Sequence, residues 1–333
     1  MDYVAIICVA VIIICAFVLS AAVRDYKYRT VYPKKYDVKK ELFDGTNGGN
    51  RIHFLNTGSS DAILIESEGH FALVDSGEDT DNPRNLPGLE LPGFEKEVLE
   101  YIKSVASDDD GKVVLDFIVG THAHSDHIGG FDTIISDDNI TVKKAYLKPY
   151  DQTRISDYEV KEWDNQEVYD QMINALNADD VEIISDIPEE DFRFGAFTCK
   201  FYNGKIYKGN KKRGENENSL GLLLSCAGSK AFLAGDINNF DGTEDEIGQK
   251  IGKVNLLKFG HHGYGGSTTA GFIKALMPAI GILTNYSINK LNKPAKKSVV
   301  NISKTAVYST GDNKGIIANF TNNGIVLTNG IMG

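Results

Sequence analysis

The chain has 333 residues, of which 42% are hydrophobic, and a formal net charge of −11. This apolar content is sufficient for one large core of roughly 250 to 290 residues after the N-terminal segment. The acidic balance argues against a protein that binds polyanions through its overall charge, although local basic patches can override it.

Residues 3–23 form an uncharged run of 21 residues rich in Val, Ile and Ala. As a helix this run would span roughly 30 Å, the hydrocarbon thickness of a bilayer. We predict a single-pass membrane anchor; the alternatives are a signal peptide cleaved near residues 20–22 or a buried helix. Seven Lys and Arg residues follow the run within residues 24–40 and none precedes it. The positive-inside rule therefore favours a cytoplasmic location for the remainder, without fixing the side.

Residues 24–50 are charged, then polar and Gly-rich, which predicts a juxtamembrane linker, and the globular part is expected at 51–328. Alternation and apolar runs predict strands at 52–55, 62–66, 71–74, 115–120, 142–147, 192–202, 219–226, 231–234, 254–259, 280–284, near 307, 316–320 and 325–328. Helical spacing predicts helices after Pro92 and at 158–176, 243–251, 268–277 and 295–303.

The strands fall into two groups, each accompanied by helices, and no repeat is visible. Two β-sheets packed face to face, with helices on both outer faces, satisfy this order. The predicted fold class is therefore an α/β protein, a four-layer αββα sandwich. Cys199 and Cys226 lie on predicted strands and are expected to be small buried hydrophobes, with a bridge between them left open. The chain has no Cys-x-x-Cys pair, which argues against a thiolate metal site.

The segment from Thr121 to Gly130 concentrates the chemistry. It contains the spacing His-x-His-x-Asp-His, formed by His122, His124, Asp126 and His127, in a chain with only seven histidines. Imidazole nitrogen and carboxylate oxygen are the ligands that Zn²⁺ and similar divalent ions prefer. A buried strand precedes the cluster and a helix start follows it, so these side chains lie on a loop where they can converge. The alternative is a group of hydrogen-bonded core or surface histidines.

The spacing and its flanks resemble the signature of the metallo-β-lactamase superfamily of binuclear metal hydrolases. The resemblance covers about residues 51–328 and implies the same αββα fold. It implies that His122 and His124 hold one metal and that Asp126 and His127 hold the other. It further implies the following roles: Asp236, after the strand 232–234, as the bridging carboxylate; His262 as the last ligand and His261 as a contact to the substrate, in an order that could be reversed; and Asp75 as a support that orients the ligands.

One expected ligand is missing, because no histidine occurs from 128 to 260. Asn216, within the segment 215–220, stands where many members have a histidine. Asn is a weak neutral ligand, which argues against a true β-lactamase or a glyoxalase-type thioesterase. The segments 51–65, 216–220, 232–236 and 257–263 instead resemble the hydrolase domain of ComEC-type DNA-uptake proteins and related phosphorylcholine esterases. The multi-spanning channel domain of those uptake proteins is absent from this sequence, so this chain alone is not expected to translocate DNA.

The resemblance implies a hydrolase with two divalent metal ions, Zn or Mn, that cleaves phosphodiester bonds by metal-activated water. Asp126, Asp236 or His261 is expected to transfer protons. Asn216, Asn218 and Lys293 are assigned to ligand support or substrate contact; Lys293 stands where the family has a histidine. The alternatives are a metal hydrolase of another bond (lactone, thioester or amide) or a metal-free binding domain.

The expected partners are a phosphate-containing substrate, either a nucleic acid or a small phosphodiester, and the membrane, through the N-terminal helix; no protein partner is inferred. Two basic loops are candidates to attract the substrate or to be solvated surface: Lys205, Lys208, Lys211, Lys212 and Arg213, and Lys290, Lys293, Lys296 and Lys297. Four aromatic residues are candidates for stacking or for core packing: Tyr146, Tyr150, Tyr158 and Trp163.

Overall fold

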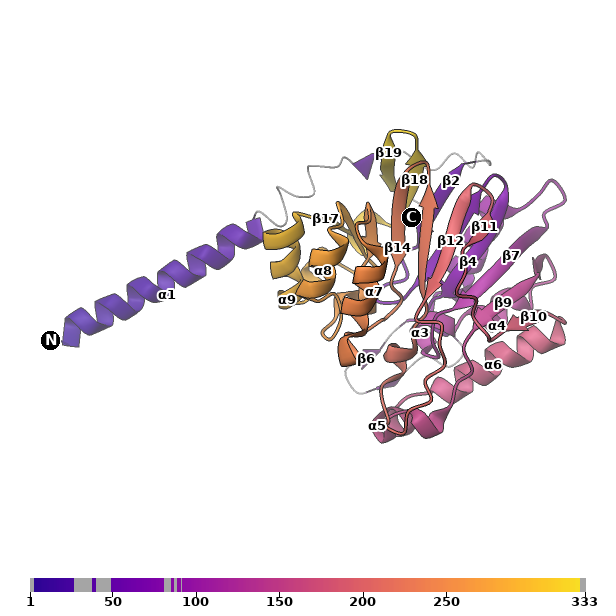
Figure 1. The fold of residues 1–333 in the computed structure, drawn as a ribbon, viewed down its shortest axis with the longest axis horizontal. Helices are drawn as coiled ribbons and strands as arrows, with labels where there is room; N and C mark the ends of the chain where they lie inside the picture. Colours follow the sequence, from indigo (N-terminus) through magenta and orange to yellow (C-terminus); the bar gives the residue numbers. More distant parts are fainter. Residues whose placement is uncertain are drawn as a thin grey trace.

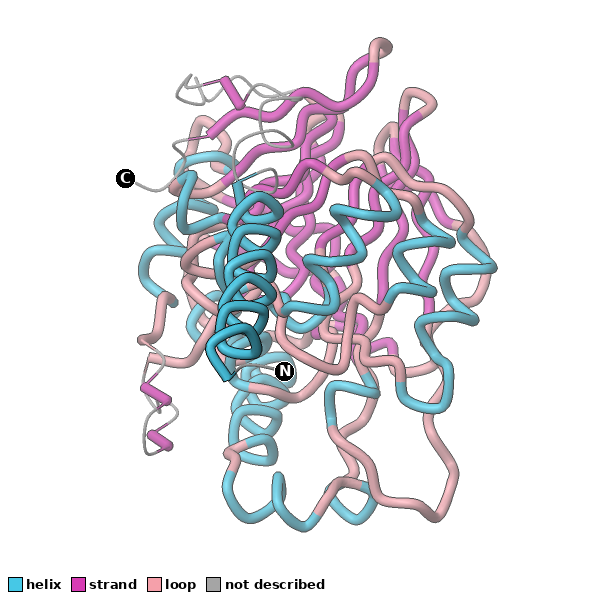
Figure 2. Tube along the Cα trace, turned by 90° about the vertical axis from the view of Figure 1, so that its left-hand side faces the viewer, coloured by secondary structure: helices cyan, strands magenta, loops and turns pink. Residues whose placement is uncertain are grey.

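A computed structural model describes residues 3–26, 38–39, 49–80, 85–86, 89–90 and 92–329. Two β-sheets lie face to face, and helices cover the outer face of each sheet (Figures 1 and 2). The αββα sandwich predicted from the sequence is confirmed.

Within the described residues the first sheet has ten strands. Its strand order is β1 (Val38–Lys39), β19 (Gly324–Asn329), β18 (Ile316–Thr321), β2 (Asn50–Phe54), β3 (Ala62–Ser67), β4 (His70–Ser76), β7 (Val113–Gly120), β9 (Lys144–Leu147) and β10 (Glu182–Ile184), with β8 (Ile140–Val142) beside β7. Strands β2, β3 and β4 are antiparallel, whereas β7 is parallel to β4 and β9 is parallel to β7.

The second sheet has seven strands in the described part of the chain. Their order is β11 (Phe192–Phe194), β12 (Phe197–Tyr202), β13 (Gly221–Cys226), β14 (Ser229–Leu233), β15 (Leu256–Lys258), β16 (Ile280–Leu283) and β17 (Ala306–Ser309). Strands β14 to β17 are parallel to one another. A separate small pair is formed by β5 (Asn85–Leu86) and β6 (Leu89–Glu90).

The α-helices are α1 (Tyr3–Tyr26), α2 (Glu95–Ala106), α3 (Ser125–Ile128), α4 (Phe131–Ile135), α5 (Asp157–Glu162), α6 (Asn165–Ala178), α7 (Thr243–Ile251), α8 (Ala270–Leu276), α9 (Lys293–Ser298) and α10 (Thr310–Asn313). Helices α2, α4 and α6 cover one sheet and α7, α8 and α9 cover the other, whereas α1 lies outside the sandwich. The shorter helical turns are η3 (Gln152–Arg154), η4 (Glu215–Asn218), η5 (Phe240–Gly242), η6 (Gly260–Gly263), η7 (Ile288–Lys290) and the π-turn η8 (Val299–Ser303).

The core has three apolar clusters, one in each gap of the sandwich. The central cluster joins the facing sheets and includes Phe54 of β2 and Phe197 of β12. The other two lie between the first sheet and α2, α4 and α6, and between the second sheet and α7, α8 and α9. On β3 the buried residues alternate between clusters, with Ile63 facing the other sheet and Leu64 facing the helices. Both faces of this strand are therefore covered, which is why its sequence is apolar at consecutive positions.

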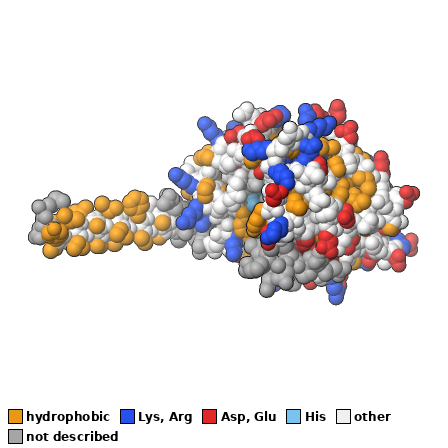
Figure 3. Space-filling model, turned by 90° about the horizontal axis from the view of Figure 1, so that it is seen from below, with side chains coloured by type: hydrophobic (Ala, Val, Ile, Leu, Met, Phe, Trp, Pro, Cys, Tyr) orange, Lys and Arg blue, Asp and Glu red, His pale blue; other side chains and the backbone are white. Residues whose placement is uncertain are grey.

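Helix α1 contains the whole predicted membrane span, Tyr3–Val23, and continues to Tyr26. Residues 24–26, assigned to the linker from the sequence, belong to the helix; most of that linker lies outside the described residues. Figure 3 shows the apolar side chains of this helix on an arm that extends from the globular part. None of the span is buried against the rest of the protein. By length and composition the span is apolar enough to cross a membrane. A signal peptide near the N-terminus would meet the same criteria.

Several local predictions from the sequence need correction. The strand predicted at 142–147 is divided into β8 and β9, and the strand predicted at 192–202 is the antiparallel pair β11 and β12. The helix predicted at 158–176 is two helices, α5 and α6, because Trp163 is extended (φ −124°, ψ 152°). Cys199 and Cys226 are both free, so the bridge left open by the sequence does not form, and both are buried as predicted.

Candidate metal centre

The candidate site lies where the ends of several strands meet at one edge of the sandwich. Strands β4 and β7 are parallel, so Asp75 of β4 and the 122–127 loop after β7 come to the same edge. Strand β3 is antiparallel to β4, so Asp61, directly before β3, reaches that edge as well. Asp236 follows β14 and His262 follows β15, a parallel pair in the second sheet. The topology therefore gathers residues separated by up to two hundred positions of sequence.

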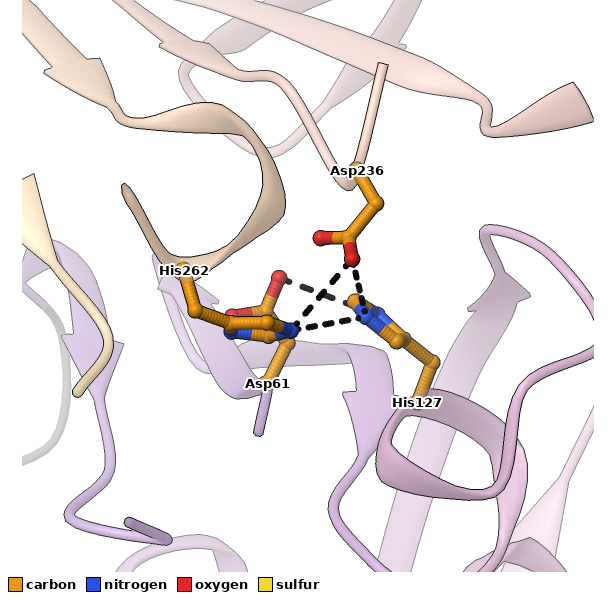
Figure 4. A group of neighbouring side chains, drawn as sticks. All are labelled: Asp61, His127, Asp236 and His262. Atoms are coloured by element: carbon orange, nitrogen blue, oxygen red, sulfur yellow. Dashed lines mark hydrogen bonds and ion pairs between the residues drawn. The ribbon is translucent and has the colours of Figure 1, made fainter. Parts of the chain in front are cut away.

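Four side chains form the centre of the site: Asp61, His127, Asp236 and His262 (Figure 4). Each offers one donor atom, and these four atoms lie within 4.8 Å of one another. His127 Nε2 is 3.1 Å from His262 Nε2, and Asp236 Oδ2 is 3.3 Å from the former and 3.5 Å from the latter. All four residues are buried.

His127 is held so that Nε2 faces the centre. Its Nδ1 donates to Asp75 Oδ2 at 2.7 Å, while Asp75 also accepts hydrogen bonds from the Thr121 N–H and hydroxyl, both at 2.8 Å. This contact fixes the tautomer and leaves the Nε2 lone pair for a cation. Asp75 has φ 57°, a left-handed conformation that is uncommon for a non-Gly residue. The geometry thus suits the supporting role predicted for Asp75.

The two adjacent histidines point in different directions. His262 Nδ1 contacts Thr284 Oγ1 at 3.2 Å, which leaves its Nε2 directed at His127 and Asp236. His261 is half-buried, and its Nε2 meets Asn216 Nδ2 at 3.2 Å. Both histidines have positive φ, 51° and 48°, within η6. Of the two orders left open by the sequence, the geometry favours His262 as the ligand.

A second pair of donors adjoins this centre. His122 Nε2 and His124 Nδ1 lie 3.0 Å apart, and the ring centroids of His122 and His127 are separated by 4.2 Å. The Ser219 hydroxyl contacts His122 Nδ1 at 3.0 Å, which turns His122 Nε2 towards His124. Asp126 Oδ2 lies 3.4 Å from His262 Nε2, on the side of the four central residues. The predicted division into two neighbouring metal positions is compatible with this arrangement.

Asn216 and Asn218 belong to the turn η4, which lies against the ligand loop. The Ala123 N–H, between His122 and His124, donates to Glu215 Oε1 at 3.1 Å, and Asn218 Nδ2 donates to Glu215 Oε2 at 2.7 Å. Asn218 therefore supports Glu215 and only indirectly the histidine loop. Asn216 Oδ1 is buried without a hydrogen bond in the described part of the molecule.

Lys293 makes no hydrogen bond or ion pair with the donor residues in the described part of the chain. It is exposed at the start of α9. The preceding residue, Asn292, holds the site instead, because its Nδ2 donates to the carbonyls of Gly263 and Tyr264 at 2.9 and 2.8 Å. The segment thus braces the turn that carries His262.

Two residues of the centre were not predicted from the sequence. Asp61 is buried among the donors, and its carboxylate pairs with the ammonium of Lys258, which is buried at the end of β15. Lys258 Nζ also donates to the Gly235 carbonyl at 2.9 Å and lies 3.7 Å from Asp236 Oδ1. A lysine within the apolar run 256–259 was the available signal, since lysine is rarely buried without a charged partner.

The charged groups of the site shift one another's pKa values. Burial by itself would lower the pKa of His127, but the carboxylates of Asp236 and Asp75 raise it to about 10. Burial would likewise raise the pKa of Asp236, but the neighbouring His127 and His262 hold it well below its usual range. For Asp61, burial is outweighed by Lys258 and His262, and its pKa falls to about 2. The carboxylates of Asp236 and Asp61 are therefore ionised at neutral pH, and that of Asp236 is able to bind a cation.

The basic side chains of the loop 205–213 make separate contacts and do not form one patch. Lys205 lies 3.3 Å from Glu189, Lys212 pairs with Asp157, and the ammonium of Lys211 is 4.3 Å from the Phe240 ring centroid. Lys208 lines a cavity, and the Arg213 guanidinium lies 3.9 Å from the Tyr207 ring centroid. Only part of this loop is therefore available to a substrate.

The four aromatic candidates lie in different environments. Tyr146 is buried in the central core between the sheets, where its ring meets Phe117 and Phe201. Tyr158 is 67% exposed, and Tyr150 lies 6.0 Å from the Tyr169 ring. The ring of Trp163 lies 4.6 Å from that of His124 and forms one wall of the site.

The residues present fit divalent cations. Two imidazole Nε2 atoms at 3.1 Å, with carboxylates beside them, are a nitrogen and oxygen donor set of the kind that Zn²⁺ and Mn²⁺ accept. Within the described residues, His124 Nε2 and Asp236 Oδ1 are buried without a hydrogen bond. Buried polar atoms left in this way mark a position that another group completes.

Comparison with known proteins identifies the family. The profile of the Beta-lactamase superfamily domain matches residues 92–265, just over half of the chain. No curated protein matches the sequence. Among solved structures, the chain is similar to the metallo-beta-lactamase fold protein YhfI from Bacillus subtilis, with 12% identity and a TM-score of 0.48, over 81% of this chain and 99% of that chain.

Two further similar structures are enzymes. CmlA, a diiron beta-hydroxylase from Streptomyces venezuelae, is 12% identical with a TM-score of 0.40, over 71% of this chain but only 45% of that one. The short form of human tRNase Z is 16% identical with a TM-score of 0.38, over 71% of this chain and 92% of that one. On the strength of the matched domain, this chain belongs to the Beta-lactamase superfamily.

Proposed function

We propose that this chain is a membrane-anchored, divalent-metal-dependent phosphodiesterase. The observation that carries the proposal is the convergence of Asp61, His127, Asp236 and His262, with four donor atoms within 4.8 Å, next to the His122–His124 pair. A binding domain that had lost its metal would not be expected to keep His124 Nε2 and Asp236 Oδ1 buried without a hydrogen bond within the described residues, since burying such groups is unfavourable.

The phosphodiester specificity rests on chemistry around the site. The segments that resemble ComEC-type hydrolase domains include Asp61, Asn216, Lys258 and His262, all of which lie in or against the centre. Lys258 adds a fixed positive charge within the centre. Arg154 and Lys208 line a cavity with Asn218 of the turn η4, and Arg213 contacts Asn218. An environment that balances its carboxylates with cations suits an anionic phosphate ester better than a neutral amide or lactone.

When bound, divalent ions lower the pKa of water and neutralise charge on phosphoryl oxygens. His122, His124, Asp126, His127, Asp236 and His262 are the residues that would hold them. Asp61 pairs with Lys258 and lies 3.4 Å from His262 Nδ1 and 3.8 Å from His127 Nδ1, so it would support the two rings from the side away from the ions. In the hydrolysis, water adds to phosphorus, one P–O ester bond breaks, and the leaving alkoxide takes up a proton. His261 is placed to take part in this proton transfer, because it is partly exposed and its Nδ1 makes no hydrogen bond within the described chain.

The test is an activity panel with the full-length protein in detergent, supplied with Mn²⁺ or Zn²⁺. The substrates are bis-p-nitrophenyl phosphate, single-stranded DNA, p-nitrophenyl phosphorylcholine and a β-lactam. We expect turnover of at least one phosphodiester and its loss, by about 10³-fold or more, in Asp236→Asn. His70→Ala is the matched control, because this histidine is exposed and pairs with Asp116 far from the donors. Turnover of the β-lactam alone would refute the proposal.

A further inference from the structure

A second cavity, distinct from the donor cluster, lies beside the candidate metal centre. Its volume is about 390 Å³, and its lining includes Lys148, Asp151, Arg154, Tyr207, Lys208 and Asn218. The lining comes from the segment after β9 and from the loop before η4. The volume falls in the range of small-molecule sites.

The lining is cationic in an acidic protein. Three of its residues carry positive charge, whereas Asp151 is the acid among the lining residues named above. That carboxylate is already engaged, because Arg154 Nε donates to it at 2.9 Å and the Thr153 N–H does so at 3.1 Å. The cavity therefore carries an excess of positive charge in a chain with a net charge of −11, and this charge is suited to an anion.

Lys148 is the residue whose surroundings point most clearly to a ligand. It is half-buried, and its Nζ donates to the carbonyl of Asn203 at 2.9 Å. It forms no ion pair with a carboxylate among the described residues. Burial lowers its pKa to about 7, although the more distant charge of Glu215 acts in the opposite direction. An anion in the cavity would supply the partner that this ammonium lacks.

The cavity and the metal centre share the turn η4. On one side Asn218 lines the cavity, and on the other Asn216 contacts His261 while Glu215 holds the Ala123 N–H of the ligand loop. Because one turn of four residues borders both sites, a group bound in the cavity would be a near neighbour of a group bound at the metal centre.

We propose that the cavity binds a second, non-scissile phosphate of the substrate, so that the preferred substrate is a short phosphorylated oligonucleotide and not a simple phosphodiester. This inference rests on the proposed phosphodiesterase function. Lys148, Arg154 and Lys208 hold the phosphate, and the Tyr207 ring, braced by Arg213, forms the wall for the attached sugar. Charge-assisted contacts of this type contribute enough to discriminate between substrates with and without the extra phosphate.

The test measures equilibrium binding to the full-length, metal-loaded protein. The probe is dithymidine joined by an uncleavable methylphosphonate, with and without a 5′-phosphate. We expect the 5′-phosphate to tighten binding at least about tenfold in the wild type, and this ratio to fall close to one in Lys148→Met and in Arg154→Met. Lys144, at the start of the strand β9 that precedes Lys148, lines a different cavity, so Lys144→Met should retain the wild-type ratio.

The controls separate this inference from the proposed function. Equal binding of the two probes by the wild type, or a ratio that survives in both cavity variants, would overturn the second-phosphate site. Arg154→Met guards against misfolding of the Lys148 variant, since Arg154 lies on a partly exposed turn. The binding assay does not depend on turnover, so failure of the phosphodiesterase panel leaves its result readable.

Discussion

At the scale of single residues, the ion pair between Lys258 and Asp61 stabilises the metal-free site. Both side chains are buried, and Asp236 lies close to the same ammonium. Replacing Lys258 with Met removes the ammonium that pairs with Asp61 and lies close to Asp236, which should destabilise the metal-free protein by about 3–5 kcal/mol. Added metal should recover more of the melting temperature in this variant than in the wild type, because the ion replaces the missing charge.

Thermal unfolding with and without Mn²⁺ measures this effect. Lys250→Met is the matched control: its ammonium pairs with Glu246 on the exposed surface of α7. An exposed pair of this kind contributes little to stability. If Lys258→Met has the same melting temperature as the wild type in the absence of metal, Lys258 does not balance the buried carboxylates.

The histidine charges predict how metal binding depends on pH. In the metal-free protein the pKa of His127 is raised to about 10 and that of His262 well above its usual value, so both rings are protonated at neutral pH. A metal must displace these protons, and its apparent affinity should therefore rise with pH by about tenfold per unit for each proton released. Lowering the pH from 8 to 6 weakens binding.

Calorimetric titration in buffers of different ionisation enthalpy counts the released protons directly. In the metal-free protein, protonation of His127 favours folding, whereas it opposes metal binding. The raised pKa of His127 stabilises the fold below its unfolded value of 6.5, and this contribution is lost as the pH rises through about 10. A pH-independent affinity with no proton release would contradict this description of the site.

At the scale of elements, close packing around Gly129 fixes the helix that carries Asp126 and His127. A Cβ at this position would lie 2.4 Å from the backbone nitrogen of Asp79 and 2.5 Å from the Ser125 carbonyl oxygen. Backbone atoms cannot yield as a flexible side chain can, so Gly129→Ala should shift α3. We expect a loss of about 1–3 kcal/mol in stability and weaker metal binding.

Gly265→Ala is the matched control for this substitution. It lies close to η6, but a Cβ there would meet nothing within 4 Å. Melting temperature and metal affinity measured on both variants separate the steric effect from the general effect of adding a methyl group. Equal behaviour of the two variants would show that the position of α3 is not set by this contact.

The elements also show what the sequence could and could not predict. Local pattern was sufficient for most strands and for α7, whose observed bounds agree with the predicted 243–251. The break between α5 and α6 was missed because Trp163 leaves the helix for a tertiary contact with His124 that periodicity does not encode. Asp61 was missed because a lone aspartate before a strand is usually a turn residue, and only the antiparallel pairing of β3 with β4 takes it to the donors.

At the scale of the whole molecule, the apolar helix α1 does not contribute to the core of the globular part. Its span, Tyr3–Val23, is unburied by the rest of the protein. We predict that the chain sediments with membranes, resists carbonate extraction, and becomes soluble when residues 3–26 are deleted. Mass spectrometry of the N-terminus distinguishes an anchor from a cleaved signal peptide, because only the anchor retains this segment. Protease accessibility in intact cells reports the side of the membrane.

The central claim is that the converging donors of the two sheets bind the ions that drive hydrolysis. The most direct measurement is the metal content of the full-length protein, determined together with its turnover of bis-p-nitrophenyl phosphate, in the wild type and in His127→Ala. We predict about two ions per chain and metal-dependent turnover in the wild type, with at most about one ion and no turnover in the variant. Wild-type protein that takes up no divalent metal, or a variant that retains both metal and activity, would contradict the account.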